Sequence, residues 1–227
     1  MYALYIANKN YSSWSLRPWV LLKTLGIPFE ERFVPFLQGS SYEEFRKFSP
    51  TGLVPCLVEN DVTVWDSLAI TEYLAETHLQ VWPADWKARA WARSASAEMH
   101  SGFSALRNIC GMNVGVRVRL HEESAALRAN LDRLDELWNE GLNRFGGPFL
   151  AGEKFTAVDA FFCPVAFRIQ TYGLKLGDAA MAYAERLLAL PAMQEWYEAG
   201  VAETIRDEPH DTEIPQVGVL IEDLRAV

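Results

Sequence analysis

Cysteine is scarce in this 227-residue sequence, and its placement disfavours two classes of site. The three cysteines, Cys56, Cys110 and Cys163, are far apart, odd in number and set among apolar residues, whereas a disulfide scaffold is dense in paired cysteines. Together with the four histidines, they form no spacing typical of metal ligands. We therefore expect reduced thiols, as in a cytosolic protein, and no bound metal.

Basic residues are also in deficit, and long apolar runs are missing. The 21 Lys and Arg residues face 30 Asp and Glu residues, a formal charge of -9, and this surplus disfavours nucleic acid and anionic membrane as partners. No apolar stretch approaches the roughly 18 residues of a membrane span, and no basic segment follows Met1 as in a secretory signal. These absences predict a soluble, cytoplasmic protein.

The residues that are present indicate a folded globule, with 50% hydrophobic and 12% aromatic residues. Its first part alternates short apolar strands with helices. We expect strands at 2–7, 30–34, 52–58 and 62–65, and helices at 16–25, 42–48 and 67–77. This β-α-β-α-β-β-α order favours a parallel first pair of strands, and the tight turn at Asn60-Asp61 makes the last pair antiparallel.

The second part loses its strand signals after a linker at 79–85. Helical patterns cover 86–109 and 127–145, and Thr156-Ala-Val-Asp159 has the spacing of a capping box at the start of another helix. Further helices are expected at 179–190 and 192–205, and an irregular tail after Pro209. The sequence thus predicts an α/β domain over 1–78 followed by an all-α helical domain over 86–227.

Three serines lie between the first strand and the first helix, in Asn10-Tyr-Ser-Ser-Trp-Ser-Leu-Arg-Pro18. Ser12 and Ser15 stand at the two cysteine places of a thioredoxin-like Cys-x-x-Cys motif, so disulfide exchange is disfavoured. The unpaired amides of a helix start favour an anion, and a serine hydroxyl there can donate a hydrogen bond to a bound thiolate. A purely structural interpretation is that Ser12, Ser13 and Ser15 only cap the helix.

Two further pairs of residues each have a structural and a functional interpretation. Pro55 either marks the start of a strand, or follows a cis Val54-Pro55 bond that presents the Val54 backbone to an extended peptide. Ser67 is an ordinary helix cap, or it binds a carboxylate while Asp66 accepts from an ammonium group.

Four features together resemble the glutathione transferase family over nearly the whole chain: Ser12-Ser-Trp-Ser-Leu-Arg17, Val54-Pro55, Asp66-Ser-Leu-Ala-Ile70 and Thr156-Ala-Val-Asp159. The serine loop is most similar to the zeta and tau classes. The resemblance implies a thioredoxin-like N-terminal domain and places thiol activation on Ser12, with Ser13 and Ser15 as second choices. It also implies that Val54 pairs with the cysteinyl part of glutathione beside a cis Pro55, and that Asp66 and Ser67 hold the γ-glutamyl group.

The sequence departs from the family pattern at two places. Trp14 stands where the zeta class has a cysteine associated with maleylacetoacetate isomerisation, and Leu53 stands where many members carry Lys or Gln near the glycyl carboxylate. The second-substrate pocket is expected to involve Met99, Phe103, Leu106 and Arg107, which are spaced so that several could share one helix face, together with the nearby His100. Packing between the domains is the alternative for each of them. Arg107 would suit an acidic or electron-poor co-substrate.

The expected function is that of a homodimeric glutathione transferase in detoxification, which holds glutathione as thiolate and conjugates it to a small electrophile. Orientation and thiolate stabilisation would supply the catalysis. The alternatives are a glutathione-dependent isomerase, resembling maleylacetoacetate isomerase, or a peroxidase on the same site. A transferase-like protein-interaction module is the alternative from another class, and glutaredoxin-like exchange is disfavoured by the two serines.

Overall fold

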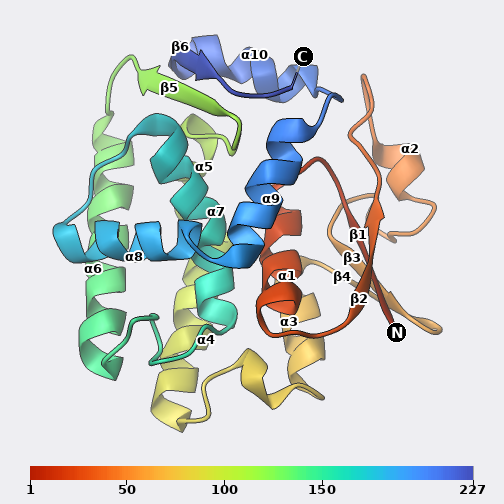
Figure 1. Cartoon of the computed structure of the whole chain (residues 1–227), viewed down its shortest axis with the longest axis vertical. Coiled ribbons are helices and arrows are strands. Elements are labelled where there is room, and N and C mark those ends of the chain that lie inside the picture. The colour runs from red at the N-terminus through yellow and green to blue at the C-terminus, as the bar shows by residue number, and fades with distance from the viewer. Residues whose placement is uncertain (227) are drawn as a thin grey trace.

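The computed structural model describes residues 1–226, and its first part is a four-stranded mixed sheet with helices (Figure 1). The elements in chain order are β1 (Tyr2–Ile6), α1 (Ser13–Thr24), β2 (Phe29–Phe33), α2 (Tyr42–Phe45), β3 (Cys56–Glu59), β4 (Val62–Trp65) and α3 (Ser67–Ala75). The strand order is β2-β1-β3-β4. The β1–β2 pair is parallel and the β3–β4 pair antiparallel, as the element order predicted.

Helix α1 lies between the sheet and the rest of the molecule and is buried by both. Tyr2, Leu4 and Ile6 alternate along β1 on its buried face, and α1 packs against α3 on the sheet side and against α7 and α9 on the other. Because α1 has apolar neighbours on opposite sides, every residue from Ser15 to Leu22 is buried. The Trp19 ring meets the edge of the Trp196 ring at 5.0 Å between centroids.

The second part begins with a 3-10 turn, η1 (Leu79–Val81), and is built mainly of helices. These are α4 (Trp86–Ser101), α5 (Ser104–Ile109), α6 (Ala125–Phe145), α7 (Ala157–Tyr172), α8 (Asp178–Leu188), α9 (Pro191–Ala202) and α10 (Glu208–Val217). Helix α7 is the centre of this part, since all but one of its residues are buried. At its start, Asp159 Oδ2 accepts from the Thr156 backbone N–H at 2.9 Å, as in the predicted capping box.

The expected continuous helix over 86–109 is divided in two. Helix α4 ends at Ser101, and Phe103 follows in the left-handed region with φ 53° before α5 begins. This conformation is unfavourable for a side chain larger than glycine, and here it accompanies the burial of the Phe103 ring. The amphipathic periodicity continues through the break, so the sequence pattern did not reveal it.

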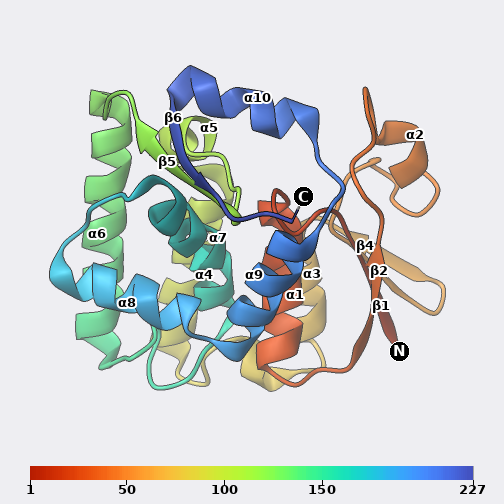
Figure 2. The same ribbon diagram turned by 45° about the horizontal axis from the view of Figure 1, so that its top comes forward.

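The expectation that strands cease after Asp85 and that the tail is irregular was wrong. Strands β5 (Val116–Leu120) and β6 (Gly218–Asp223) form an antiparallel pair, and α10 precedes β6. The weak periodicity of the tail had suggested irregular packing, but Pro209 occupies the first turn of α10, where a missing amide costs nothing. In both ribbon views α10 and β6 lie at the end of the molecule that carries the β1–α1 loop (Figure 2).

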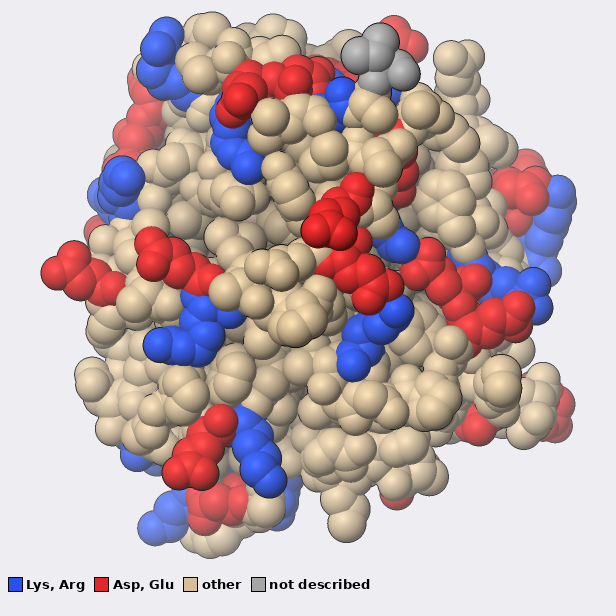
Figure 3. Space-filling model, viewed as in Figure 1, with Lys and Arg blue, Asp and Glu red and all other residues tan. Residues whose placement is uncertain are grey.

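Charged side chains on the face drawn in Figure 3 lie in mixed groups, with Lys and Arg beside Asp and Glu and broad uncharged areas between them. Ion pairs join charged side chains of the two parts of the chain, such as Lys23 with Glu195 at 2.6 Å. Within residues 1–226, no helix is both long and apolar enough to cross a membrane.

Candidate functional site

A cavity of about 560 Å³ lies where the two parts of the chain meet, and the serine loop forms one of its walls. Ser12, Ser13 and Trp14 line it from the start of α1, and Leu53 and Val54 from the loop before β3. The helical part adds Arg107, Arg168, His210 and Glu213. Elements from both ends of the chain therefore enclose one space.

The three serines have different positions in this wall. Ser12 and Ser13 face the cavity, whereas Ser15 is fully buried beneath them. Ser12 Oγ lies 2.7 Å from Ser15 Oγ and donates to it, and Ser15 Oγ also accepts from the Ala7 N–H at 3.3 Å. The Ser12 side chain makes no capping hydrogen bond. The Ser15 hydroxyl thus links the end of β1 to the loop, and Ser12 lines the cavity.

A second cavity of about 520 Å³ adjoins the first and contains the other predicted glutathione-site residues, Val54, Pro55, Asp66 and Ser67. The Val54-Pro55 peptide bond is cis. Among residues 1–226, the backbone N–H and C=O of Val54 form no hydrogen bond. The Val54 backbone is therefore free to pair with an extended ligand that runs between the two cavities.

The cap of α3 is Asp66, where the structural interpretation of the sequence had assigned Ser67. Asp66 has φ 74°, and its Oδ1 accepts from the N–H groups of Leu68 and Ala69 at 2.8 and 3.3 Å. Ser67 is fully buried, and its hydroxyl accepts from Arg17 Nη1 at 3.4 Å. The Asp66 carboxylate is thus partly occupied by the helix start, which leaves Oδ2 for His100 Nε2 at 3.3 Å.

Two arginines flank Trp14 and a third contacts the neighbouring Ser13, and none of the three has a carboxylate partner in the described chain. The guanidinium carbons of Arg17 and Arg107 lie 4.2 and 4.8 Å from the Trp14 ring centre, and Arg168 Nη2 donates to Ser13 Oγ at 3.5 Å. No carboxylate oxygen of the described chain lies within 4 Å of any of these guanidinium groups. Positive charge is therefore concentrated at the start of α1, in a protein of net charge -9.

Burial lowers the pKa of two of these guanidinium groups. Desolvation lowers the pKa of Arg17 to about 9, with repulsion from Arg168 and Arg107 as further causes. Desolvation likewise lowers the pKa of Arg168 to about 10. A buried cation is costly unless an anion or hydrogen bonds compensate it, and Arg17 Nε has no partner in the described part of the chain. The site is thus arranged to gain free energy when an anion enters.

The predicted second-substrate residues separate in the structure. Arg107 lines the cavity, but Met99 and Phe103 are buried in the core and lie outside its wall. His100 lies behind Trp14, where it bonds Asp66 and meets the Trp14 ring edge. The four residues do not share one helix face because the helix is interrupted at Gly102–Phe103, and Arg107 on α5 lies over the Trp14 ring while Met99 and Phe103 are buried.

The sequence interpretation missed Arg17, Arg168 and His210 as site residues. Arg17 belonged to the quoted serine motif, and a lone arginine in the apolar run Phe167-Arg-Ile169 was a signal for Arg168. His210 had no such signal, because the tail has weak periodicity. Among residues 1–226, no group of three or more His, Cys, Asp and Glu side chains is placed to hold a metal ion.

Comparison with known proteins gives the family. The family models described as glutathione S-transferase N-terminal and C-terminal domain match residues 11–77 and 117–199. A zeta-class glutathione S-transferase of Euphorbia esula is 29% identical over 157 residues, covering 67% of this chain and 70% of that protein. Maleylacetoacetate isomerase of Rattus norvegicus is 27% identical over 199 residues, covering 84% and 89%.

A solved structure supports the same assignment. The glutathione transferase homologue of Burkholderia GL BGR1, determined with bound glutathione, superposes with a TM-score of 0.65 at 25% identity, over 88% of this chain and 97% of that one. The matched regions include the serine loop, the Val54-Pro55 turn, Asp66-Ser67 and the central helix α7. This chain therefore belongs to the glutathione S-transferase family.

Proposed function

We propose that this protein is a glutathione transferase that holds glutathione as a thiolate at Ser12 and transfers it to a small electrophile. The observation that carries the proposal is the junction of Ser12, the start of α1 and two arginines without carboxylate partners, Arg107 and Arg168, at one cavity. The Trp14 backbone N–H, in that first turn, has no partner among the described residues. Hydroxyl, helix terminus and guanidinium groups all favour the anionic form of a thiol.

The tripeptide would extend from one cavity into the other. Its γ-glutamyl carboxylate would meet the Ser67 hydroxyl and Arg17, which already contact each other, and its ammonium would meet Asp66. The cysteinyl backbone would pair with Val54, which brings the sulfur to the serine wall. Leu53 is 64% exposed and has no charge, so the glycyl carboxylate would be held by water or another group.

The required stabilisation is modest. A free thiol has a pKa of about 8.5, and lowering it by two units corresponds to about 2.7 kcal/mol. Ser15 lies where it can assist, because a reversal of the Ser12–Ser15 hydrogen bond would let Ser15 donate to Ser12 and free the Ser12 proton for the sulfur. Ser15 would thus be a positioning residue, while Ser12 contacts the thiolate.

The second substrate would be an electrophile with an anionic or electron-poor group, bound by Arg107 and Arg168 in the larger cavity. Isomerisation of an unsaturated acid is the second candidate, since relatives include maleylacetoacetate isomerases and the two arginines suit a carboxylate. Trp14, in place of the zeta-class cysteine, favours conjugation instead.

Homodimer formation and a cytosolic location complete the proposal, and the three free, buried cysteines fit a reducing compartment.

The decisive experiment is an ultraviolet difference titration of bound glutathione against pH. We expect a thiolate band at neutral pH in the wild type, and a pKa at least about one unit higher in Ser12→Ala, which is about 1.4 kcal/mol. Ser13→Ala and Ser15→Ala serve as matched comparisons. An unchanged pKa in Ser12→Ala would transfer the role to Ser13 or the backbone, and the absence of glutathione binding would favour a non-catalytic interaction module.

Arg107 is tested by kinetics with paired electrophiles that differ only in a carboxylate. Arg107→Ala should raise KM for the acidic member about tenfold or more, as expected for loss of about 1.4 kcal/mol, and leave the neutral member nearly unchanged. If neither electrophile responds to the substitution, Arg107 has no part in substrate binding.

A further inference from the structure

The chain after residue 199 lies outside the matched family regions and yet helps to enclose the cavity. The peptide passes through α10, which brings His210 and Glu213 to the cavity wall, and returns as β6 beside β5. Any catalytic contribution from this segment would therefore come from residues outside the regions that match the family models.

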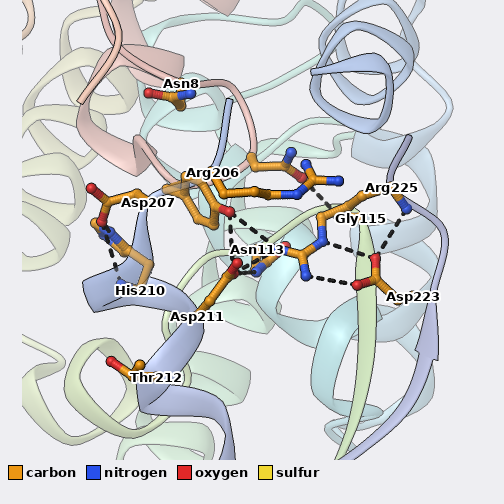
Figure 4. A network of polar contacts seen from close by, with 12 residues as sticks. Asn8, Asn113, Gly115, Arg206, Asp207, His210, Asp211, Thr212, Asp223 and Arg225 are labelled. Atoms are coloured by element: carbon orange, nitrogen blue, oxygen red, sulfur yellow. Dashed lines mark hydrogen bonds and ion pairs between the residues drawn. The ribbon is translucent and has the colours of Figure 1, made fainter. Parts of the chain in front are cut away.

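The tail, residues 200–226, contacts the serine loop through a network of hydrogen bonds and ion pairs (Figure 4). Arg225 Nη1 donates to Tyr11 Oη at 3.1 Å and to Asp211 Oδ1 at 2.6 Å, and Tyr11 Oη donates to the same Asp211 oxygen at 3.1 Å. Arg225 also bonds Asp223 at 2.7 Å. Because Tyr11 immediately precedes Ser12, these contacts fix α10 relative to the serine wall.

His210 is held on two sides within this arrangement. Its Nδ1 bonds Asp207 Oδ2, from a carboxylate that is buried at the start of α10. Its ring stacks on Tyr11 and Phe36, with centroid distances of 5.1 and 5.5 Å. Within residues 1–226, Nε2 has no hydrogen-bond partner. An Asp207 carboxylate that accepts from Nδ1–H leaves a lone pair on Nε2.

We propose that His210, oriented by Asp207, accepts the thiol proton of glutathione in the cavity it shares with Ser12. The inference rests on the proposed function and assigns the route of the proton that thiolate formation releases. A histidine whose second nitrogen is oriented by a carboxylate is a recurring arrangement in general-base catalysis.

The step is a proton transfer with no change of oxidation state. The S–H bond breaks and leaves its electron pair on sulfur, while the Nε2 lone pair forms the new N–H bond. The products are the thiolate, stabilised by Ser12 and the arginines, and an imidazolium, stabilised by Asp207. The imidazolium then releases its proton to water, or to the carbanion that forms when the thiolate adds to an activated double bond.

Charged and titratable groups of several elements lie around His210 or line the same cavity. They are Asp207, Asp211 and Glu213 on or beside α10, Tyr11 on the serine loop, Arg225 after β6, and Arg107 and Arg168 across the cavity. Since only neutral imidazole accepts a proton, activity should rise with pH as His210 deprotonates.

The test uses the full-length wild type, His210→Gln, Asp207→Asn and the control His121→Gln. His121 is exposed and lies outside the cavity, where its Nε2 faces the Pro215 carbonyl near the other end of α10. Stopped-flow absorbance measures the rate at which thiolate forms on mixing with glutathione, and titration gives the Kd. We expect His210→Gln to slow thiolate formation about 100-fold at neutral pH, with Kd nearly unchanged and the acidic limb of the kcat/KM profile lost.

Asp207→Asn should give a smaller loss of rate, because Asn still orients the ring but does not stabilise the imidazolium. His210→Ala adds a second readout, since added imidazole should restore its rate in a saturable way. A thiolate band in the wild type with an unchanged rate in His210→Gln, or equal losses in His121→Gln, would overturn this inference alone. A wild type without any thiolate band would overturn the proposed function as well.

Discussion

Asp159 is a single buried carboxylate that holds three segments together. Its oxygens accept from the Leu150 N–H at 3.0 Å, the Thr156 N–H at 2.9 Å and the Tyr183 hydroxyl at 2.8 Å. These donors belong to the loop before α7, the cap of α7 and helix α8. One side chain thus satisfies polar groups that would otherwise be buried without partners.

Asp159→Ala should lower the free energy of unfolding by roughly 3–5 kcal/mol at neutral pH, because three buried donors lose their acceptor. Urea unfolding measures this loss. Asp85→Ala is the matched control, an exposed cap residue that accepts from the Lys87 and Ala88 amides and should cost only about 1 kcal/mol. Equal effects of the two substitutions would contradict the role of burial.

The same carboxylate should impose a pH dependence on stability. Burial raises the pKa of Asp159 to about 6, and the hydrogen bonds to Leu150, Thr156 and Tyr183 only partly offset this. The native state therefore holds the proton more tightly than the unfolded state between about pH 4 and pH 6, so stability falls as pH rises through this window. Relative to Asp159→Asn, the wild type should lose up to about 3 kcal/mol across it. Urea unfolding at several pH values that showed parallel curves for the two proteins would contradict this.

At the scale of elements, the tail is held on the serine loop mainly through Arg225. Its guanidinium is nearly buried and contacts Tyr11, Asp211 and Asp223. Desolvation of such a group is compensated only while its partners are present. Arg225 therefore contributes strongly to the position of α10 against the cavity, together with the β5–β6 pairing.

Arg225→Ala should destabilise the protein by about 2–3 kcal/mol, because the contacts to two carboxylates are lost and Asp211 keeps only weaker donors. Amide hydrogen exchange should become faster in α10 and the serine loop than in α6. Arg119→Ala is the control, since Arg119 is an exposed arginine on β5 that forms no ion pair among residues 1–226, and should change stability by less than about 0.5 kcal/mol. If amide hydrogen exchange in α10 were the same in Arg225→Ala as in the wild type, the β5–β6 pairing alone would be sufficient to hold α10 in place.

At the scale of the whole molecule, α1 packs against both parts of the chain. It packs on the sheet and α3, and also on α7 and α9, and the buried cluster runs without interruption from Leu4 through Trp19 to Phe162. The two parts of the chain therefore share one core, and neither buries its apolar surface alone.

We expect one cooperative unfolding transition, with coincident urea midpoints by tryptophan fluorescence and far-ultraviolet circular dichroism. The fragment 1–78 alone should show no cooperative transition, because the α7-facing side of α1 would be exposed to water. Two separate midpoints, or a folded fragment, would show that the parts are independent.

Local patterns were sufficient for much of the first part of the fold. The alternation along β1 and the apolar run of α1 each contain their own signal, and the β-α-β order implies a parallel pair whatever lies around it. The Thr156–Asp159 spacing likewise predicted the start of α7, since a capping box uses neighbouring residues only. Ser12, Val54 and Ser67 were predicted as site residues from motifs of the same local kind, and the structure places them on the walls of the two adjoining cavities.

The sequence by itself thus determined the order of the first seven elements and the serine wall, because these depend on contacts between residues close in the chain. Tertiary structure alone decided the rest. The arginines near Trp14 and Ser13 come from three helices, α1, α5 and α7. His210 stacks on Tyr11, almost the full length of the chain away, and β5 pairs with β6 near the C-terminus. Such contacts follow from how the helices pack. The tail forms regular elements partly because Arg225, Asp211 and Tyr11 bond one another, and no local sequence pattern could have predicted these contacts.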